Sequence, residues 1–153
     1  MKKRLYMLSL LLIAGLLLSS CGGKQEITVS SKNFTEQYIL GWMTVLALED
    51  AGYAVNNQVD LGGTAVNREA LENGEVDIYW EYTGTAWLVH LGHENAITDP
   101  AECYAKVKQE DAENELVWLD YAPFNNTYTL MMTQAAGDEY GISKISELGK
   151  LLE

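Results

Sequence analysis

The stretch EITVSSKNFTEQYILGWMTVLALED, residues 26–50, decides the fold. Its first five residues, Glu26–Ser30, alternate β-branched with polar side chains and predict a short strand. After Ser31-Lys32-Asn33, apolar residues recur at helical spacing over Phe34–Asp50, namely at Phe34, Tyr38, Trp42, Val45 and Leu46. Asn33 is the expected cap of this helix, and Glu36 stands three residues later, as in a capping box. The chain therefore begins with a strand followed by a helix.

The alternation of strands and helices continues along the chain. An order strand-helix-strand-helix-strand-helix implies an α/β fold with a mixed, mainly parallel sheet covered by helices. Ligands of such sheets bind where strands end, so Ser30–Asn33, Leu61–Thr64 and Glu81–Thr85 are expected on one rim. The elements predicted after residue 50 are strands over Tyr53–Leu61, Val76–Trp80, Leu116–Tyr121 and Thr127–Thr133, helices over Ala65–Glu72, Pro100–Glu113 (capped by Asp99) and Ser143–Leu152, an apolar segment over Ala86–Leu91, and a loop over 134–141.

Composition limits the function classes. The 153 residues include 10 Lys+Arg and 22 Asp+Glu, which gives a net charge of -12, and 48% are hydrophobic. That apolar fraction supports a packed core. A surface this acidic repels phosphate backbones, so a nucleic-acid partner is not expected.

The N-terminus has the organisation of an export signal. Lys2-Lys3-Arg4 precede an apolar run, Leu5–Leu18, of about 14 residues, which is shorter than the ~20 residues that span a bilayer as a helix. The run ends in Leu18-Ser19-Ser20-Cys21, which resembles a bacterial lipobox. The resemblance implies cleavage before Cys21, lipidation of its thiol, and membrane anchoring on the extracytoplasmic side. Residues 1–20 are then a lipoprotein signal peptide and residues 21–25 a tether; the alternative is a plain cleavage site.

Three features that could carry enzymatic chemistry are weak. Cys103 lies in a helical stretch without a second cysteine to pair with once Cys21 is lipidated, so a buried thiol is expected. His90 and His93 with Glu94 supply too few well-placed ligands for zinc, and no metal or cofactor is expected. Asp77 and Glu81 are four residues apart, which leaves one alternative: a small extracytoplasmic hydrolase that uses Asp77, Glu81 or His90.

Aromatic residues crowd two places along the chain. The first group is Tyr79, Trp80, Tyr82 and Trp87, and the second is Tyr121, Phe124 and Tyr128. Core packing accounts for some of them, and an exposed aromatic rim that docks a protein partner is another alternative. Beside a chain this poor in cations, aromatic faces also suit a quaternary ammonium, which has no N–H group to donate and is held by cation–π contact.

Several motifs together resemble one family. They are ITVSSKNFTEQ (27–37), LGGT (61–64), REAL (68–71), GEVDIY (74–79), EYTGT (81–85) and FNNTY (124–128). In combination they look like the substrate-binding proteins of osmoprotectant ABC importers, which take up glycine betaine, choline, carnitine and related quaternary amines. The similarity runs from about residue 26 to the end.

The resemblance implies a two-lobed, periplasmic-binding-protein-like fold of type II that closes on its ligand by hinge motion. Residues 26–120 are then lobe 1, and residues 121–153 are the hinge crossing and the start of lobe 2. Members of the family are about twice this length, so the chain is expected to be truncated to the N-terminal half, with a second lobe only begun.

The resemblance also implies the function and the site. The expected function is a non-enzymatic solute receptor that delivers a quaternary amine to the membrane-embedded permease. The family pocket is a box of tyrosines, into which Tyr82 and Tyr128 are carried by their motifs. Thr85 is expected to tune which amine fits, and Gln37 and Thr64 are weaker pocket candidates. The side chains that bind the ligand carboxylate are expected beyond Glu153.

Overall fold

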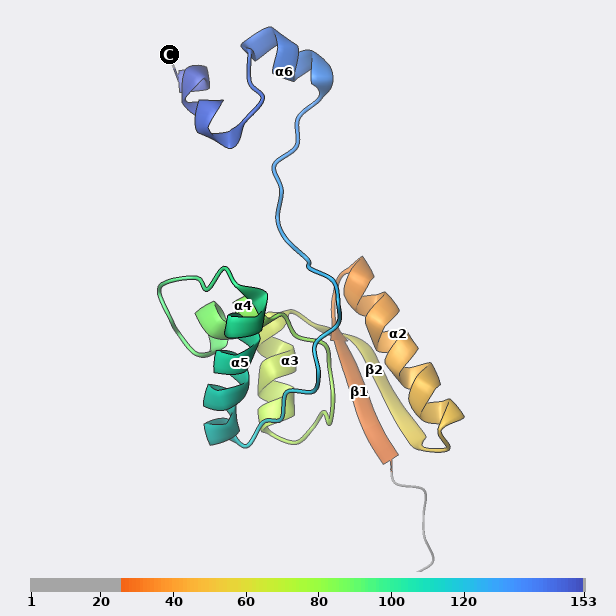
Figure 1. Ribbon diagram of the computed structural model, residues 1–153. Helices are drawn as coiled ribbons and strands as arrows, with labels where there is room; N and C mark the ends of the chain where they lie inside the picture. Colours follow the sequence, from red (N-terminus) through yellow and green to blue (C-terminus); the bar gives the residue numbers. More distant parts are fainter. Residues whose placement is uncertain (1–25, 153) are drawn as a thin grey trace, which may run out of the picture. The chain divides into compact units, whose positions relative to one another are not determined.

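The computed structural model describes residues 26–152 (Figure 1). The predicted signal peptide, the tether and the lipidation site at Cys21 lie outside the described residues. The described chain divides into two compact units, of which unit 1 ends at Leu119 and unit 2 begins at Asp120. Within residues 26–152, no helix combines the length and the apolar character needed to cross a bilayer.

Unit 1 is organised around a parallel strand pair. Strand β1 (Glu26–Lys32) and strand β2 (Ala54–Gly62) are joined through helix α2 (Thr35–Asp50), and their register runs from Glu26 opposite Ala54 to Ser30 opposite Gln58. Figure 1 shows α2 on one side of this pair and the helices α3, α4 and α5 on the other. The predicted strands and the helix between them are confirmed, because each follows from local periodicity.

The predicted cap of α2 is wrong. The helix begins at Thr35 with extended Phe34 as its cap residue, and no side chain caps it. The carboxylate of Glu36 instead accepts a 2.7 Å hydrogen bond from the Tyr82 hydroxyl. A tertiary partner has therefore replaced the local capping interaction.

Helix α3 (Thr64–Glu72) follows β2 directly, as predicted within one residue. Its Asn67 is fully buried and accepts a hydrogen bond from the Ser30 hydroxyl at 2.7 Å. The Asn67 amide nitrogen donates to the carbonyl oxygens of Gly62 and Gly63 at 2.9 and 3.0 Å. One buried amide thus fixes the start of α3 against β1.

The third predicted strand, Val76–Trp80, is reduced to an isolated parallel bridge between Val29 and Ile78. Backbone bonds join Ser30 N to Ile78 O and Ile78 N to Thr28 O. The next rung is missing because the Asp77 carboxylate accepts from the Thr28 N–H at 2.7 Å. That N–H is the donor that a longer parallel ladder would use.

The other regular elements described in unit 1 are helical. Helix α4 (Thr83–Thr85) continues into the π-turn η1 (Ala86–His90), and helix α5 (Pro100–Asp111) is followed by the 3-10 turn η2 (Ala112–Asn114). The predicted Asp99 cap is confirmed by a 2.7 Å bond from the Glu102 N–H. The predicted burial of Cys103 is also confirmed. Its thiol lies in an apolar cluster with Ala86, Trp87 and Val107, against which Leu91, Ile97 and Trp118 pack.

Unit 2 contains helix α6 (Gln134–Tyr140) and the 3-10 helix η3 (Ile145–Leu152). The strands predicted over Leu116–Tyr121 and Thr127–Thr133 are wrong, and so is the loop predicted over 134–141, where α6 forms. A strand needs a hydrogen-bonded neighbour, and among the described residues the only paired strands are β1 and β2. Helix α6 forms instead because Thr133 caps it and Gly141, at φ 61°, ends it.

Candidate functional site

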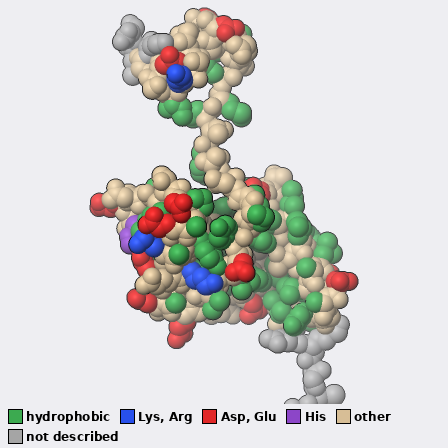
Figure 2. Space-filling model, viewed as in Figure 1, with side chains coloured by type: hydrophobic (Ala, Val, Ile, Leu, Met, Phe, Trp, Pro, Cys, Tyr) green, Lys and Arg blue, Asp and Glu red, His purple; other side chains and the backbone are tan. Residues whose placement is uncertain are grey.

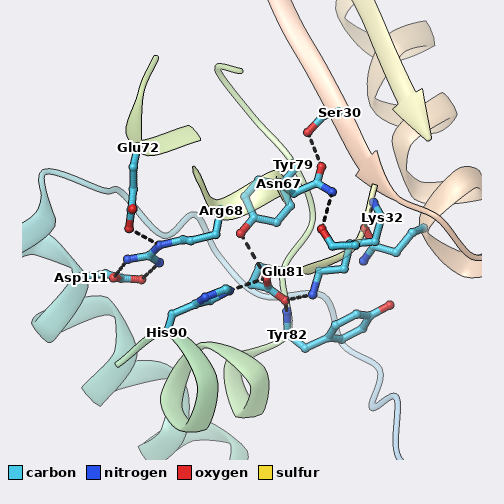
Figure 3. Close-up of polar contacts among 12 residues, drawn as sticks. Ser30, Lys32, Asn67, Arg68, Glu72, Tyr79, Glu81, Tyr82, His90 and Asp111 are labelled. Atoms are coloured by element: carbon cyan, nitrogen blue, oxygen red, sulfur yellow. Dashed lines mark hydrogen bonds and ion pairs between the residues drawn. The ribbon is translucent and has the colours of Figure 1, made fainter. Parts of the chain in front are cut away.

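A buried charged cluster surrounds Glu81 (Figure 3). Its Oε1 pairs with the Lys32 ammonium and accepts from the Tyr82 N–H at 2.7 Å. Its Oε2 accepts from the Tyr79 hydroxyl at 3.1 Å and lies 3.0 Å from His90 Nε2. The side chains of Lys32, Glu81 and His90 are only 3%, 5% and 6% exposed. The buried charges of Glu81 and Lys32 are tolerated because the two side chains pair with each other and both oxygens of Glu81 have hydrogen-bond partners.

The environment sets the protonation states of two groups in this cluster. Burial alone would raise the pKa of Glu81, but the hydrogen bond with His90 and the charge of Lys32 outweigh it, so the pKa of Glu81 lies below its usual value. Burial and the neighbouring Glu81 carboxylate raise the pKa of Tyr79 far above its usual value. At neutral pH, Glu81 is therefore an ionised acceptor and Tyr79 a neutral donor.

Tyr82 lies at the start of α4, beside this cluster. The Lys32 ammonium lies 5.2 Å from the centroid of the Tyr82 ring, within cation–π range. Phe34 stacks on the same ring with a centroid separation of 6.1 Å and an interplanar angle of 20°. The hydroxyl is held by Glu36. The aromatic ring predicted to bind a cation thus contacts one that belongs to the protein.

Gln37 occupies the first turn of α2 and is fully buried. Its Oε1 accepts from the Lys32 backbone N–H at 3.4 Å. Its Nε2 has no hydrogen-bond partner among the described residues. A buried amide N–H without an acceptor is unfavourable by about 1–3 kcal/mol.

These contacts join two of the three segments that were expected on one rim, and the strand register places the third beside them, because Lys32 lies opposite Gly62. The end of β1 supplies Lys32, and the segment before α4 supplies Glu81 and Tyr82. Thr85 is the last residue of α4 and is half-buried, as is Thr64, the first residue of α3.

Tyr128 lies in unit 2, in the irregular segment before α6. Its side chain is fully exposed, at 104%. Tyr121 and Phe124, the other aromatic residues of this group, are also exposed. Among the predicted pocket residues in unit 1, Gln37 and Tyr82 are both linked to Lys32.

The other chemically suggestive residues have local structural partners. Asp77 is exposed and binds the Thr28 backbone, whereas Glu81 is buried in the lysine–histidine cluster, so the two carboxylates sit in different environments. His93 pairs with Glu110 at 2.7 Å and stacks on Trp87 with ring centroids 3.4 Å apart. Within the part of the chain that the structure describes, no three His, Cys, Asp or Glu side chains are grouped so as to hold a metal ion.

Lys32 is the residue that the sequence interpretation missed. A lysine just after a strand reads as an exposed charge, yet Lys32 is 2% exposed and lies between Glu81 and Tyr82. The available signal was its position, because Ser31-Lys32-Asn33 belongs to the rim segment at the end of the first strand.

A parallel βαβ unit that carries aromatic and charged side chains at the strand ends is typical of a small-molecule binding lobe. Residues 25–153 match the family described as the substrate-binding domain of the ABC-type glycine betaine transport system, and the chain belongs to that family.

The similarity to individual members is substantial. The chain is 39% identical over 139 residues to a glycine-betaine-binding protein of Pseudomonas aeruginosa, covering 91% of this chain and 44% of that protein. It is 36% identical over 152 residues to the carnitine transport binding protein OpuCC of Listeria monocytogenes, covering 93% and 49%. The solved structure of apo YehZ from Escherichia coli superposes with a TM-score of 0.65 at 36% identity, covering 83% of this chain and 46% of that one. The chain thus spans less than half the length of these relatives.

Proposed function

We propose that this chain is the ligand-binding lobe of an extracytoplasmic receptor for quaternary ammonium compounds that also carry a carboxylate, such as glycine betaine and carnitine. The observation that carries the proposal is the arrangement at Lys32, whose ammonium lies 5.2 Å from the Tyr82 ring while its backbone N–H binds the buried Gln37 amide. Two of the relatives are named for glycine betaine and carnitine, which supports the same ligand class.

The trimethylammonium group is assigned to aromatic faces. It has no N–H group, so cation–π contact is its main specific interaction. Tyr82 supplies one such ring, and we propose that Tyr128 supplies another when the receptor closes on its ligand. Thr85 and Thr64 are proposed to border this pocket. A net charge of -12 attracts cations over the whole surface.

The ligand carboxylate is assigned to Lys32 and Gln37. Lys32 contributes a positive charge, and Gln37 Nε2 contributes a buried donor that lacks an acceptor. A carboxylate oxygen accepts well from such donors. This assignment differs from the expectation that all carboxylate-binding side chains follow residue 153.

The cellular context is part of the proposal. The lipobox-like sequence before Cys21 supports lipid anchoring on the extracytoplasmic face of a membrane. The family, which serves ABC-type transport, supports delivery of the ligand to a permease. The family, described as a substrate-binding domain of a transport system, supports a receptor over the hydrolase alternative.

Saturation-transfer NMR tests the proposal, because it detects weak complexes of a partial cage. The methyl protons of glycine betaine and carnitine are expected to receive saturation from the 153-residue chain, and those of choline less, since choline lacks the carboxylate. The signal is expected to vanish in Tyr82→Ala and persist in Tyr82→Phe, which keeps the ring.

Tyr104→Ala is the matched control, because Tyr104 carries Lys108 at 5.3 Å in a similar lysine–tyrosine contact on α5. This variant is expected to leave the signal unchanged. Absence of transfer from the unmodified chain, or equal loss in the Tyr82 and Tyr104 alanine variants, contradicts the assignment.

A further inference from the structure

The start of α2 makes two contacts with Tyr82. Glu36 lies in the first turn of this helix, where an acidic side chain ordinarily serves the helix end, yet no side chain caps α2. Its Oε1 instead accepts a 2.7 Å hydrogen bond from the Tyr82 hydroxyl, 46 residues away. Phe34, two residues before Glu36, stacks on the same ring with a centroid separation of 6.1 Å. One helix start thus holds both the ring and the hydroxyl of Tyr82.

Two carboxylates contact Tyr82 at opposite ends of the residue. Glu81 accepts from the backbone N–H at 2.7 Å and pairs with the Lys32 ammonium. Glu36 binds the phenol hydroxyl, which points away from Glu81 in the close-up (Figure 3). The charge of Glu81 is therefore matched by Lys32, whereas the charge of Glu36 acts on the aromatic ring.

A carboxylate at the phenol hydroxyl strengthens the attraction of the ring for a cation in two ways. A hydrogen bond to an ionised acceptor is strong, and it polarises the O–H bond so that electron density shifts toward the ring. Because cation–π contact is electrostatic, a more negative ring face holds a cation more tightly. The charge of the carboxylate also attracts that cation directly, across the width of one ring.

We infer that Glu36 is a positioning residue that acts through Tyr82 and sets the preference for a quaternary ammonium over an uncharged group of the same shape. The inference rests on the proposed function, in which Tyr82 holds the trimethylammonium group. It adds a division of charge to that site. Lys32 serves the carboxylate of the ligand, and Glu36 lies behind the ring that faces the cation. A zwitterion such as glycine betaine is then matched at both ends.

The probe that isolates this effect is the anion of tert-butylacetic acid. It has the shape and the carboxylate of glycine betaine, with an uncharged carbon in place of the ammonium nitrogen. Saturation-transfer titration gives the affinity of the 153-residue chain for each compound. Glu36→Gln keeps an oxygen acceptor but loses the charge, so the preference for glycine betaine is expected to fall about threefold or more. Glu36→Asp keeps the charge and is expected to retain most of the preference.

The matched control is Asp60→Asn. Asp60 Oδ1 accepts from the Tyr38 hydroxyl at 2.9 Å, so this variant makes the same chemical change at a different tyrosine–carboxylate pair of unit 1. It is expected to leave the preference unchanged. Equal loss of preference in Glu36→Gln and Asp60→Asn would overturn the inference.

A double-mutant cycle tests whether Glu36 acts through Tyr82. Tyr82→Phe keeps the ring and removes the hydroxyl that holds Glu36. The effect of Glu36→Gln on the preference is therefore expected to be smaller in the Tyr82→Phe background. Full additivity of the two substitutions would show that Glu36 acts by another route and would overturn the inference.

A measurement without ligand separates this inference from the proposed function. In the ligand-free chain, the cation on the Tyr82 ring is the Lys32 ammonium. The ring-current shift of the Lys32 Cε protons is expected to decrease in Glu36→Gln and to stay constant in Asp60→Asn. If neither compound binds the unmodified chain while this shift decreases, the proposed function is contradicted and the action of Glu36 on the ring stands. If Glu36→Gln weakens both compounds equally and leaves the shift unchanged, the inference is overturned and the proposed function stands.

Discussion

Arg68 of α3 and Asp111 of α5 form a buried, bidentate ion pair, with Nη1–Oδ2 and Nη2–Oδ1 distances of 2.9 and 2.7 Å. Asp111 is fully buried and also accepts from Trp118 Nε1 and Asn114 Nδ2. Burial disfavours its ionised form, but these donors outweigh that effect and lower the pKa of Asp111. The pair fastens the helices of unit 1 on the side of the sheet opposite α2 (Figure 1).

Removal of one partner of this pair is expected to be severely destabilising. Asp111→Ala leaves the Arg68 charge buried without its main partner, which lowers the free energy of unfolding by about 3–5 kcal/mol. Glu72→Gln is the control, because the Glu72 side chain is 45% exposed and its pair with Arg68 is worth about 0–1 kcal/mol. Urea denaturation measures the free energy of unfolding of both variants. Equal losses in the two would show that burial does not determine how much each ion pair of Arg68 contributes to stability.

Acid is expected to unfold unit 1 through its two buried carboxylates. The pKa values of Glu81 and Asp111 are lower in the folded chain than the ordinary values of about 4. Their contribution to stability is therefore fully present above about pH 4–5 and is lost as pH falls through the folded values. Urea midpoints measured from pH 7 to pH 3 should fall below pH 5, and Glu81→Gln should flatten part of that fall. A profile that Glu81→Gln leaves unchanged would contradict a depressed pKa at Glu81.

Asn67 should be essential to the packing of α3. Asn67→Ala removes an acceptor from the buried Ser30 hydroxyl and donors from two glycine carbonyls, and a loss of about 2–3 kcal/mol in unfolding free energy is expected. The control is Asn73→Ala at the exposed end of the same helix, where little change is expected. Thermal unfolding compares the two variants, and similar melting temperatures would argue against a role for the buried amide.

An exposed apolar stripe on α2 is expected to promote self-association of the chain. Its side chains, Ile39, Trp42, Met43 and Leu46, are each between 50% and 60% exposed, and Figure 2 shows hydrophobic side chains gathered over this helix. An exposed contiguous apolar surface favours association. Ile39→Lys with Met43→Lys is expected to reduce binding of a hydrophobic dye and self-association in light scattering.

The unfolding free energy of this double variant should change by only about 0.5 kcal/mol, as for ordinary surface positions. Val45→Lys, on the buried face of the same helix, should instead unfold unit 1, because Val45 is 2% exposed. If the double variant binds the hydrophobic dye as strongly as the unmodified chain, the surface responsible for self-association lies elsewhere.

Cys21 is expected to carry the membrane anchor. Cys21→Ala removes the thiol that lipidation requires, so the chain should accumulate uncleaved or lose lipid modification. Detergent phase partition and intact mass measure both effects, with Cys103→Ala as the control because that thiol is buried in unit 1. A Cys21→Ala chain that is still processed and lipidated would refute the assignment.

Local pattern was sufficient for the first half of the fold. The β1–α2–β2–α3 order, the Asp99 cap and the burial of Cys103 all follow from the periodicity or chemistry of one short segment. Two of the sequence errors occurred where a group far along the chain intervened. Asp77 interrupts the predicted third strand because its carboxylate binds the backbone N–H of Thr28, 49 residues away. The Glu36 carboxylate does not cap α2 because it binds the hydroxyl of Tyr82, 46 residues away.

The amino-acid sequence by itself determined the α/β class and the family, because strand and helix periods and linear motifs are properties of consecutive residues. Only the tertiary structure decided that Lys32 lies on the Tyr82 ring and that Glu81 joins Lys32 to His90. Lys32 and Glu81 are 49 residues apart, and their pairing arises when the end of β1 meets the segment before α4. A buried charge takes whichever partner the fold brings within hydrogen-bond reach, and no spacing along the chain encodes that meeting.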